Sequence, residues 1–451
     1  MKVVVGIDLG STTTKAVLLG EDGEILGRGI TNSRSNYEVA CAVAREEALT
    51  DARFSLLSAA IRTHSDASGE PSGVDDEALR AAFQLEIYIE ELAALRRRIF
   101  ELVSLQPEVS RAPLADVVTT IMDKMVADAP DLFLKEGGRK SDFFRDLAGA
   151  AYMAGAEDLS RTSGVPFGRV LSLYDRAILD VETEVRSHDF ALLLRSAVER
   201  VFDTAGSEEQ RYGLPRVVTE VGQTAIDEVA FVGTGYGRQT LPFPKEAVRS
   251  EILCHGRGAH RVFPGTRTVL DIGGQDTKAI QVNDQGVVTS FQMNDRCAAG
   301  CGRYLGYVAD ELNLGLHELG PLALKSCKAT KVNSTCTVFA GAELRERLAL
   351  GENREDILAG LHRAIMLRAM SLLARSGGVK DEFTFTGGVC KNPMATRVLR
   401  ELVNENYGTE ITLNAHPDSI FMGALGAAMF GLDDLRAGRP CTLPRRTAAV
   451  A

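Results

Sequence analysis

Two kinds of hydrophobic pattern divide this chain. Short apolar runs with strand-like composition stand near its start and again in its second half, as in KVVVGI, KAVLLG, RTVLDI and KAIQV. Between them, residues 33–225 lack strand alternation and repeat apolar positions at helical spacing, as in ALRAAFQLEIYIEELAALRRRIFELV. The patterns predict an α/β protein with strand-rich regions on both sides of a large helical insert.

An internal repeat relates the two strand-rich regions. DLGSTTTKAV, residues 8–17, matches DIGGQDTKAI, residues 271–280, with Asp, Gly, Thr, Lys and Ala at equivalent positions. Each copy is an apolar run, a Gly-rich turn and a second apolar run, which predicts a β-hairpin. A duplication over this distance predicts two related lobes, and a cleft between lobes is a common place for a small ligand.

Both Gly-rich turns have the composition of phosphate-binding loops, because glycine allows close approach and backbone N–H groups and hydroxyls donate to phosphate oxygens. We expect Asp8 and Asp271 to face a magnesium ion and Gln275 to orient an attacking water, and we add Asp276 to the catalytic set. The candidate nucleotide contacts are Gly10, Ser11, Thr12, Thr13, Lys15, Gly273, Gly274 and Lys278. Either copy alone is equally compatible with a plain hairpin; the repetition favours a nucleotide clamp.

A third glycine-rich element follows the apolar run DEFTF. Gly387 and Gly388 would allow close approach of a flat adenosine, and they are equally compatible with a tight strand-to-helix turn.

Composition narrows the class of protein. With 451 residues, 45% hydrophobic and 25% charged, the chain is expected to be globular with two or three domains. A net charge of -10 argues against a nucleic-acid partner. No signal-peptide pattern and no apolar run of membrane-spanning length is recognised, so we expect a cytoplasmic protein with no membrane partner.

Two of the eight cysteines precede helical patterns, Cys297 in RCAAGCGRYLGYVADEL and Cys336 in STCTVFAGAELRERL. A thiolate at a helix start is stabilised by free N–H groups and the helix dipole, which favours metal binding. Two such sulfurs could hold half of an iron–sulfur cluster, since a complete one usually takes four cysteines. A second subunit would supply the other half.

The order of two phosphate hairpins, a GG turn and a GALGAA helix resembles the actin, hexokinase and heat-shock 70 ATPase superfamily. VGTGYGR, EILCHGRGAH, NDRCAAGCGRYL, STCTVFA, FTGGVCKN and MGALGAA narrow the resemblance to the activators of 2-hydroxyacyl-CoA dehydratases and the ATP-binding subunits of benzoyl-CoA reductase. The resemblance covers residues 1–32 and about 226–432. The insert, which opens with TNSRSNYEVACAVAREEALTDARF, resembles that of the larger ATP-binding subunit of benzoyl-CoA reductase.

This resemblance implies that Cys297 and Cys336 bind a 4Fe-4S cluster shared with a smaller homologous ATPase subunit. ATP hydrolysis would change the angle between the helices at the cluster and pass low-potential electrons from ferredoxin to catalytic subunits that reduce benzoyl-CoA. We accordingly expect ATPase lobe segments with both phosphate loops at residues 1–32 and 226–290. The remaining parts would be the helical insert at 33–225, the cluster helices and second lobe at 291–435, and a tail at 436–451.

Some residues keep two interpretations. Cys301, four residues after Cys297, could be a substitute ligand on the same helical face, and we favour a small packed residue. Glu251 and His255, also spaced i, i+4, could bind metal, but we expect them to order a helix or lobe interface and keep them out of the metal site. We interpret Cys254 and Cys390 as buried thiols.

Two other functions stay open. The same clamp and cluster could activate a 2-hydroxyacyl-CoA dehydratase. A sugar or acid kinase of the superfamily would also explain the phosphate loops, but it would leave Cys297 and Cys336 without a role.

Overall fold

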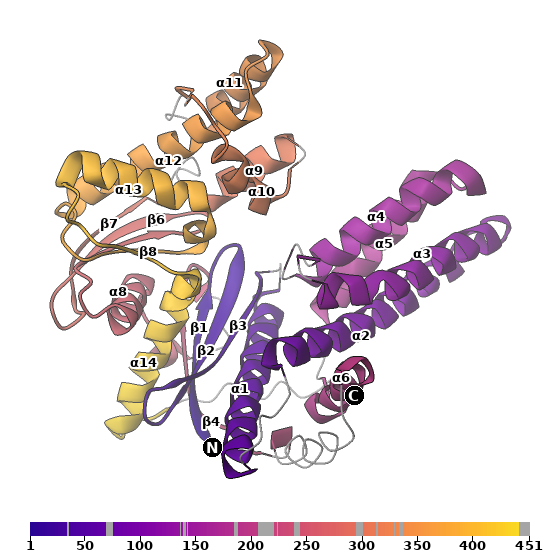
Figure 1. Ribbon diagram of the computed structural model, residues 1–451, viewed down its shortest axis with the longest axis horizontal. Coiled ribbons are helices and arrows are strands. Elements are labelled where there is room, and N and C mark those ends of the chain that lie inside the picture. Colours follow the sequence, from indigo (N-terminus) through magenta and orange to yellow (C-terminus); the bar gives the residue numbers. More distant parts are fainter. Residues whose placement is uncertain are drawn as a thin grey trace. The chain divides into compact units, whose positions relative to one another are not determined.

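The protein was analysed as a computed structural model (Figure 1), which describes residues 1–33, 36–68, 75–135, 137–138, 141, 143–184, 188–205, 221–222, 224–238, 244–294, 301–312, 314–328, 330–332 and 337–441. Cys297 and Cys336 lie outside these ranges. The chain forms two compact units, one of Met1–Leu49 with Ile226–Ala451 and the other of Thr50–Ala225. Each unit is described by itself.

The first sheet of the larger unit is built on the N-terminal hairpin. Its strand order is β3-β2-β1-β4, with β4 parallel to β1 and the other pairs antiparallel. The strands are β1 (Lys2–Leu9), β2 (Thr13–Gly20), β3 (Ile25–Asn32) and β4 (Asp227–Thr234). Glycines let helices approach closely: a Cβ on Gly6 would lie 2.1 Å from the Ala424 carbonyl oxygen of α14 (Met422–Arg436).

The second sheet repeats this topology. Its order is β7-β6-β5-β8-β9, with β8 parallel to β5, so its first four strands match the first sheet in order and direction. The strands are β5 (Thr268–Ile272), β6 (Thr277–Val282), β7 (Val288–Asn294), β8 (Phe383–Thr386) and β9 (Leu413–Ala415). The repeat in the sequence therefore corresponds to two equivalent sheets.

Helices complete the larger unit. Besides α14 they are α8 (Glu251–Val262), α9 (Gly302–Glu311), α10 (Leu316–Ala323), α11 (Thr337–Ala349), α12 (Arg354–Ser376) and α13 (Pro393–Tyr407), with 3-10 turns η2 (Lys245–Ala247), η4 (Gly388–Lys391) and η5 (Pro417–Phe421). Contrary to our reading of the sequence, α12 is long and apolar enough to span a membrane, but most of it is buried in the core of this unit.

Helix α8 packs between α14 and the second sheet. A Cβ on Gly258 would lie 2.0 Å from the Met422 carbonyl oxygen of α14, and one on Gly256 would lie 2.8 Å from Val288 of β7. Small residues on both faces therefore allow α8 to lie close to each neighbour. Glu251, in its first turn, lies close to Asp8 of β1 and to Lys278 of β6.

The smaller unit is helical, as the periodicity predicts. Its helices are most of α1 (Tyr37–Ser68), α2 (Asp76–Ser104), α3 (Glu108–Leu134), α4 (Phe144–Ser163), α5 (Phe167–Thr183) and α6 (Phe190–Ala205). Leu79, Phe83 and Leu92 of the helical pattern are buried. The unit has its own apolar clusters, one of them around Tyr88, Ile121 and Tyr152.

The units differ from the expected segments at two places. The start of α1, up to Leu49, belongs to the larger unit, whereas we placed the insert from residue 33. The second phosphate hairpin, which we grouped with residues 1–32, lies in one sheet with β8 and β9. Strand neighbours are set by tertiary pairing, which separation along the sequence does not reveal.

Candidate functional site

The two repeated aspartates occupy equivalent positions in the two sheets. Asp8, on β1, is paired with Lys15 across the hairpin and with Thr234 of the parallel strand. Asp271, on β5, is paired in the same way with Lys278 and Thr386. Both carboxylates are buried, each with 2% of the residue exposed.

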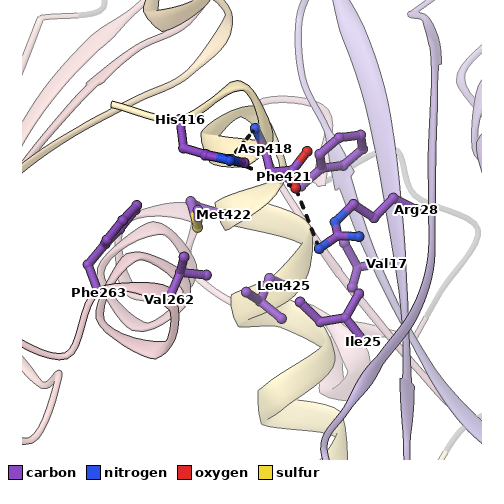
Figure 2. Close-up of a pocket in the computed structure, with 10 residues that line it drawn as sticks. All are labelled: Val17, Ile25, Arg28, Val262, Phe263, His416, Asp418, Phe421, Met422 and Leu425. Atoms are coloured by element: carbon purple, nitrogen blue, oxygen red, sulfur yellow. Dashed lines mark hydrogen bonds and ion pairs between the residues drawn. The ribbon is translucent and has the colours of Figure 1, made fainter. Parts of the chain in front are cut away.

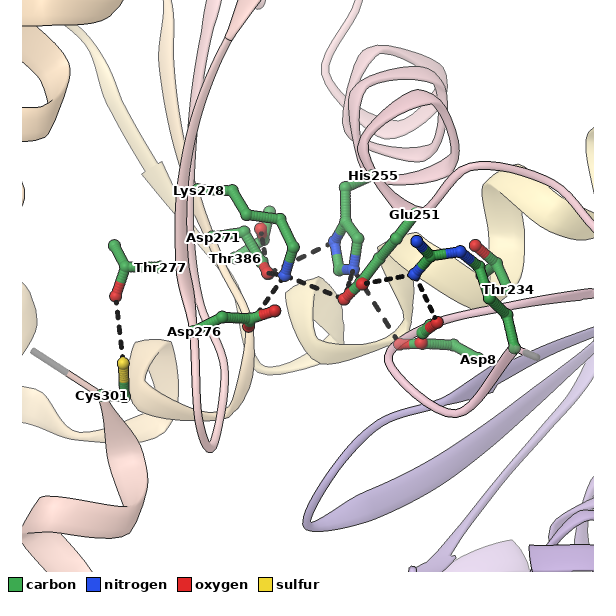
Figure 3. Close-up of polar contacts among 12 residues, drawn as sticks. Asp8, Thr234, Glu251, His255, Asp271, Asp276, Thr277, Lys278, Cys301 and Thr386 are labelled. Carbon is green, nitrogen blue, oxygen red and sulfur yellow. Dashed lines mark hydrogen bonds and ion pairs between the residues drawn. The ribbon is translucent and has the colours of Figure 1, made fainter. Parts of the chain in front are cut away.

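Lys278 is the centre of a buried ion network (Figure 3). Its Nζ lies 2.8 Å from Glu251 Oε1, 2.8 Å from Asp276 Oδ1 and 3.3 Å from Asp271 Oδ2. Burial opposes the charged form of Lys278, but the three carboxylates dominate and raise its pKa well above the usual value. The lysine is therefore a structural cation, fully buried and already surrounded by acids.

Asp271 is held ionised by its neighbours. Burial would raise its pKa, but His255, Lys278 and a hydrogen bond from the Thr386 hydroxyl, 2.9 Å long, lower it to about 2. Glu251 behaves differently: burial raises its pKa and outweighs the opposing effect of Lys278. The site thus contains one strongly acidic carboxyl and one whose proton is more readily retained.

His255 of α8 lies between the two aspartates. Its Nδ1 is 3.3 Å from Asp271 Oδ1 and its Nε2 is 3.9 Å from Asp8 Oδ2, and only 3% of the residue is exposed. Glu251, one turn earlier on α8, reaches Lys278 of the second sheet. One helix therefore links the aspartates of both lobes (Figure 3).

From the sequence we expected Glu251 and His255 to lie outside the metal site. We expected an i, i+4 pair without further ligands, whereas the fold adds carboxylates from β1, β5 and the second turn. The signal was the spacing together with the position of EILCHGRGAH between the two phosphate hairpins. Only the packing of α8 between the lobes shows what surrounds the pair.

The cluster has the donors expected of a divalent-cation site. The ligand atoms of Asp8, Glu251 and His255 lie within 4.8 Å of one another, and so do those of Glu251, Asp271 and Asp276. Asp8 Oδ1 and Asp276 Oδ2 are buried and have no hydrogen-bond partner among the described residues. Carboxylate oxygens without a donor suit magnesium, which prefers oxygen ligands.

The two glycine-rich turns meet at their tips. A Cβ on Gly274 would lie 2.0 Å from Thr12 Oγ1 and 3.0 Å from Ser11 Oγ. A side chain at this position would therefore displace the Thr12 side chain of the first turn. Gln275, next to Gly274, is partly exposed at the same tip.

Each turn is held from behind by hydrogen bonds to its carbonyl groups. In the first turn the Ser33 hydroxyl donates to Gly10 O over 2.6 Å and the Ser33 N–H donates to Thr12 O over 2.8 Å. In the second turn the N–H groups of Gly302 and Arg303, at the start of α9, donate to Gly273 O and Gly274 O, both over 2.8 Å.

The GG element follows β8 beside Asp271. Gly387 has a φ of 85°, and a Cβ there would lie 2.3 Å from Ile272 O, so glycine is required. A Cβ on Gly388 would meet nothing within 4 Å. The first glycine thus shapes the turn, and the second offers open backbone.

The predicted site residues of the two phosphate hairpins divide into three groups. The aspartates Asp8, Asp271 and Asp276 come together around α8. Lys15 and Lys278, which we expected to contact nucleotide, pair with carboxylates; Lys15 Nζ lies 3.6 Å from Asp8 Oδ2. The turn residues Gly10, Ser11, Thr12, Thr13, Gly273, Gly274 and Gln275 lie at the ends of the two hairpins.

Cys301 departs from the helical interpretation. It has an extended backbone, with φ −129° and ψ 165°, and α9 begins only at Gly302; its relation to Cys297 lies outside the described residues. Its fully buried Sγ lies 3.6 Å from Thr277 Oγ1.

Burial raises the pKa values of Cys254 and Cys390 to about 12, which makes both unreactive core thiols.

A separate pocket of about 150 Å³ is lined by residues of η5 and the first turn of α14, together with β2, β3 and the end of α8 (Figure 2). Its lining is mainly apolar, and its charged groups include Arg28 and Asp418, whose side chains are 3.6 Å apart. It includes none of the aspartates of the phosphate turns.

Two equivalent sheets, each with an aspartate and a glycine-rich turn at a shared cluster, define a duplicated α/β fold of the actin and hexokinase type. The chain belongs to the BadF/BadG/BcrA/BcrD ATPase family, whose model matches residues 5–431. The expected fold class is thereby confirmed.

The chain is similar to three proteins whose roles are named. The chain is 41% identical over 222 residues to the (R)-2-hydroxyglutaryl-CoA dehydratase activating ATPase of Acidaminococcus fermentans, which covers 48% of this chain and 82% of that protein. Against the 2-hydroxyisocaproyl-CoA dehydratase activator of Clostridioides difficile, identity is 35% over 53% of this chain and 87% of the relative. A benzoyl-CoA reductase subunit of Thauera aromatica is 32% identical, over 50% of this chain and 78% of the relative.

A solved structure supports the same fold. The crystal structure of the Acidaminococcus fermentans (R)-2-hydroxyglutaryl-CoA dehydratase component A matches with a TM-score of 0.50 and 24% sequence identity, covering 97% of this chain and 100% of that chain.

Proposed function

We propose that this chain is an ATP-hydrolysing activator that delivers electrons to an acyl-CoA dehydratase. The observation that carries the ATPase part is the buried cluster in which Asp8 and Asp271, from equivalent strands, lie on either side of His255. The partner class follows from the relatives named as dehydratase activators. This changes the order of our expectations, since the sequence alone favoured benzoyl-CoA reductase.

In the proposed ATPase, the N–H groups and hydroxyls of the two turns bind the phosphates. Asp8 and Asp276, each with a carboxylate oxygen lacking a hydrogen bond, would hold magnesium, which neutralises charge on the transferred phosphate. Gln275, partly exposed at the second turn, would orient the attacking water. Gly388 offers its open backbone to the adenosine.

Cys297 and Cys336 would supply half of a 4Fe-4S cluster shared with a second subunit, as the family resemblance implies. The cluster would supply one-electron transfer at low potential. The role of this chain would be to couple that electron transfer to the closing and opening of the two turns. A nucleotide can drive such a change only if it binds the closed and the open state with different affinities.

The ATP-binding subunit of a benzoyl-CoA reductase is the second candidate. It is favoured by the helical insert, whose opening sequence resembles that of the larger subunit of this enzyme, and by the similarity to the benzoyl-CoA reductase subunit of Thauera aromatica. Both candidates use the same clamp and the same cysteines, and they differ in the catalytic partner.

The test begins with the full chain purified without oxygen and assayed for ATP hydrolysis, iron and the EPR signal of a reduced cluster. We expect ATPase activity and a cluster that Cys336→Ala no longer assembles, while Cys441→Ala, at a cysteine outside the proposed site, leaves it intact. Adding 2-hydroxyacyl-CoA dehydratase or benzoyl-CoA reductase catalytic subunits then distinguishes the partners. An iron-free protein that phosphorylates a small hydroxylated substrate would overturn the proposal in favour of a kinase.

A further inference from the structure

The segment VGTGYGR, residues 232–238, carries an arginine to the edge of the acidic cluster. Gly235 has a φ of 98°, and a Cβ there would lie 2.5 Å from Asp8 Oδ1, so glycine is required. Two residues on, the N–H of Gly237 donates to Leu9 O over 2.9 Å. The chain after β4 therefore turns closely against the end of β1, beside Asp8.

Hydrogen bonds hold the end of β4 against the start of α8. The N–H of Arg249 donates to Gly233 O over 2.9 Å, and the Thr234 hydroxyl donates to Arg249 O over 3.0 Å. Helix α8 begins two residues later, at Glu251, which lies between Lys278 and the Asp8 carboxylate (Figure 3). The residues that follow β4 are thus placed next to the first turn of α8.

Arg238 uses this position to reach the cluster. Its Nη1 donates to Gly235 O over 3.1 Å and lies 3.9 Å from Glu251 Oε2. Among the residues that the structure describes, its Nε and Nη2 have no partner. A guanidinium group has five N–H donors in a planar fork, and this fork suits the oxygens of a phosphate group. The arginine is therefore held from one side, and its other donors are available to a ligand.

The charges of the cluster favour a role for this arginine. The Lys278 side chain, 1% exposed, is surrounded by three carboxylates, and Lys15, 11% exposed, pairs with Asp8 at 3.6 Å. Both lysines are thus occupied by protein carboxylates. The Arg238 side chain is 40% exposed and faces a single carboxylate at a longer distance. A nucleoside triphosphate adds several negative charges to an already acidic site, so it needs cations besides magnesium.

We propose that Arg238 is a catalytic residue that binds the terminal phosphate of ATP and stabilises the charge on it during hydrolysis. In this reaction a water oxygen bonds to the terminal phosphorus, the bond from that phosphorus to the bridging oxygen breaks, and ADP leaves with the electron pair. One proton of the water stays on the phosphate and the other passes to solvent. Guanidinium donors aimed at the transferred group stabilise the charge that develops on it. The inference rests on the proposed ATPase function and adds a residue to it.

Substitutions at Arg238 test the role of its charge and of its fork. We expect Arg238→Gln to lower kcat for ATP hydrolysis by the full chain with magnesium about a hundredfold. Arg238→Lys keeps the charge as a single ammonium group and should recover part of the rate. The control is Arg261→Gln, because Arg261 lies in the last turn of α8 and pairs with the exposed Glu24 at 3.9 Å. Its rate should equal that of the wild type.

Binding measurements separate this catalytic role from a structural one. ADP with magnesium and aluminium fluoride imitates the phosphate in transfer, whereas ADP with magnesium alone lacks the transferred group. Calorimetry on Arg238→Gln should show binding of the aluminium fluoride complex weakened about a hundredfold, with the Kd for ADP within about twofold of the wild-type value. If Arg238 only supports Glu251 through their ion pair, both ligands should lose affinity equally.

The outcomes distinguish this inference from the ATPase function itself. A wild-type chain that hydrolyses no ATP overturns both. An active wild type with Arg238→Gln as fast as Arg261→Gln, or with equal losses of affinity for the two ligands, overturns only the role of Arg238. If Arg238→Gln does not fold, Arg238→Lys decides: a slower rate with a selective loss for the aluminium fluoride complex supports the role, and an unchanged rate overturns it.

Discussion

Lys278 is the residue whose surroundings differ most from its appearance in the sequence. Next to a phosphate turn, a lysine looks like a phosphate ligand. Here its ammonium group is fully buried among Glu251, Asp271 and Asp276. A buried charge of this kind is tolerated only because its partners are buried with it. The lysine holds the acids in place, and in the proposed function the turn backbone and hydroxyls are the groups that bind phosphate.

Replacing Lys278 by methionine tests this role. Lys278→Met leaves three buried carboxylates without their common cation, and we expect the free energy of unfolding to fall by about 3 kcal/mol or more. The measurement is urea denaturation followed by circular dichroism. The matched control is Lys2→Met, because Lys2 forms an exposed ion pair with Glu21 at 3.8 Å and should contribute less than about 1 kcal/mol. Equal effects of the two substitutions would contradict the assignment.

A second prediction at the residue scale concerns Gly274. Gly274→Ala places a methyl group against the Thr12 hydroxyl and should prevent the two turns from meeting, lowering the rate of ATP hydrolysis about tenfold or more. Removing the opposing side chain in Gly274→Ala/Thr12→Gly should restore part of the closed arrangement. A Gly274→Ala protein that hydrolyses ATP at the wild-type rate would show that close contact between the turns is not needed for hydrolysis.

At the scale of elements, a buried histidine connects α12 to α13. His362 Nδ1 donates to Leu358 O over 2.7 Å, and its Nε2 accepts from Asn392 Nδ2 over 3.0 Å. Asn392 Oδ1 meanwhile accepts from the N–H groups of Met394 and Ala395 and caps α13. A proton on Nε2 would therefore face an amide group that cannot turn round without releasing the cap.

This geometry predicts acid sensitivity. Burial lowers the pKa of His362 from 6.5 to about 4, so the unfolded chain binds the proton more readily than the folded one. The contribution to stability is complete above pH 6.5 and is lost as the pH falls toward 4. We expect the unfolding free energy of the wild type to fall by about 2 kcal/mol more than that of His362→Gln between pH 7 and 4.5. Parallel pH profiles would contradict this.

Helices α8 and α14 cross closely because α14 has a glycine at the crossing. Two Gly→Ala substitutions, one at the crossing and one away from it, test this dependence. A Cβ on Gly426 would lie 1.9 Å from Cys254 O, whereas one on Gly306 of α9 would meet nothing within 4 Å. Gly426→Ala should therefore destabilise the protein by about 1–3 kcal/mol. Gly306→Ala should stabilise it by up to about 1 kcal/mol. Thermal unfolding compares the two, and a stable Gly426→Ala protein would show that α8 can move away from α14.

At the scale of the whole molecule, the apolar clusters around Phe54, Phe83 and Tyr152 lie entirely within Thr50–Ala225. We expect residues 50–225, produced alone, to have a helical circular dichroism spectrum and to unfold cooperatively, because the core needs no residue of the larger unit. A spectrum without a thermal transition would show that this core depends on the rest of the chain.

The sequence by itself determined the repeated hairpins, their aspartates and the helical nature of the insert, because these depend on local periodicity, turn residues and repetition. Most apolar positions of this helical pattern are buried in α2. Cys301 is buried, as the favoured interpretation of a small packed residue predicts, although its backbone is extended and α9 begins only after it.

Only the tertiary structure decided what surrounds those residues. It placed Glu251 and His255 between the lobes, turned Lys278 into a buried structural cation and attached α9 to the second turn. These relations join residues from separate strands and helices through packing at glycines such as Gly258 and Gly426. Which surfaces meet depends on close packing in three dimensions, and the order of residues along a chain does not specify that locally.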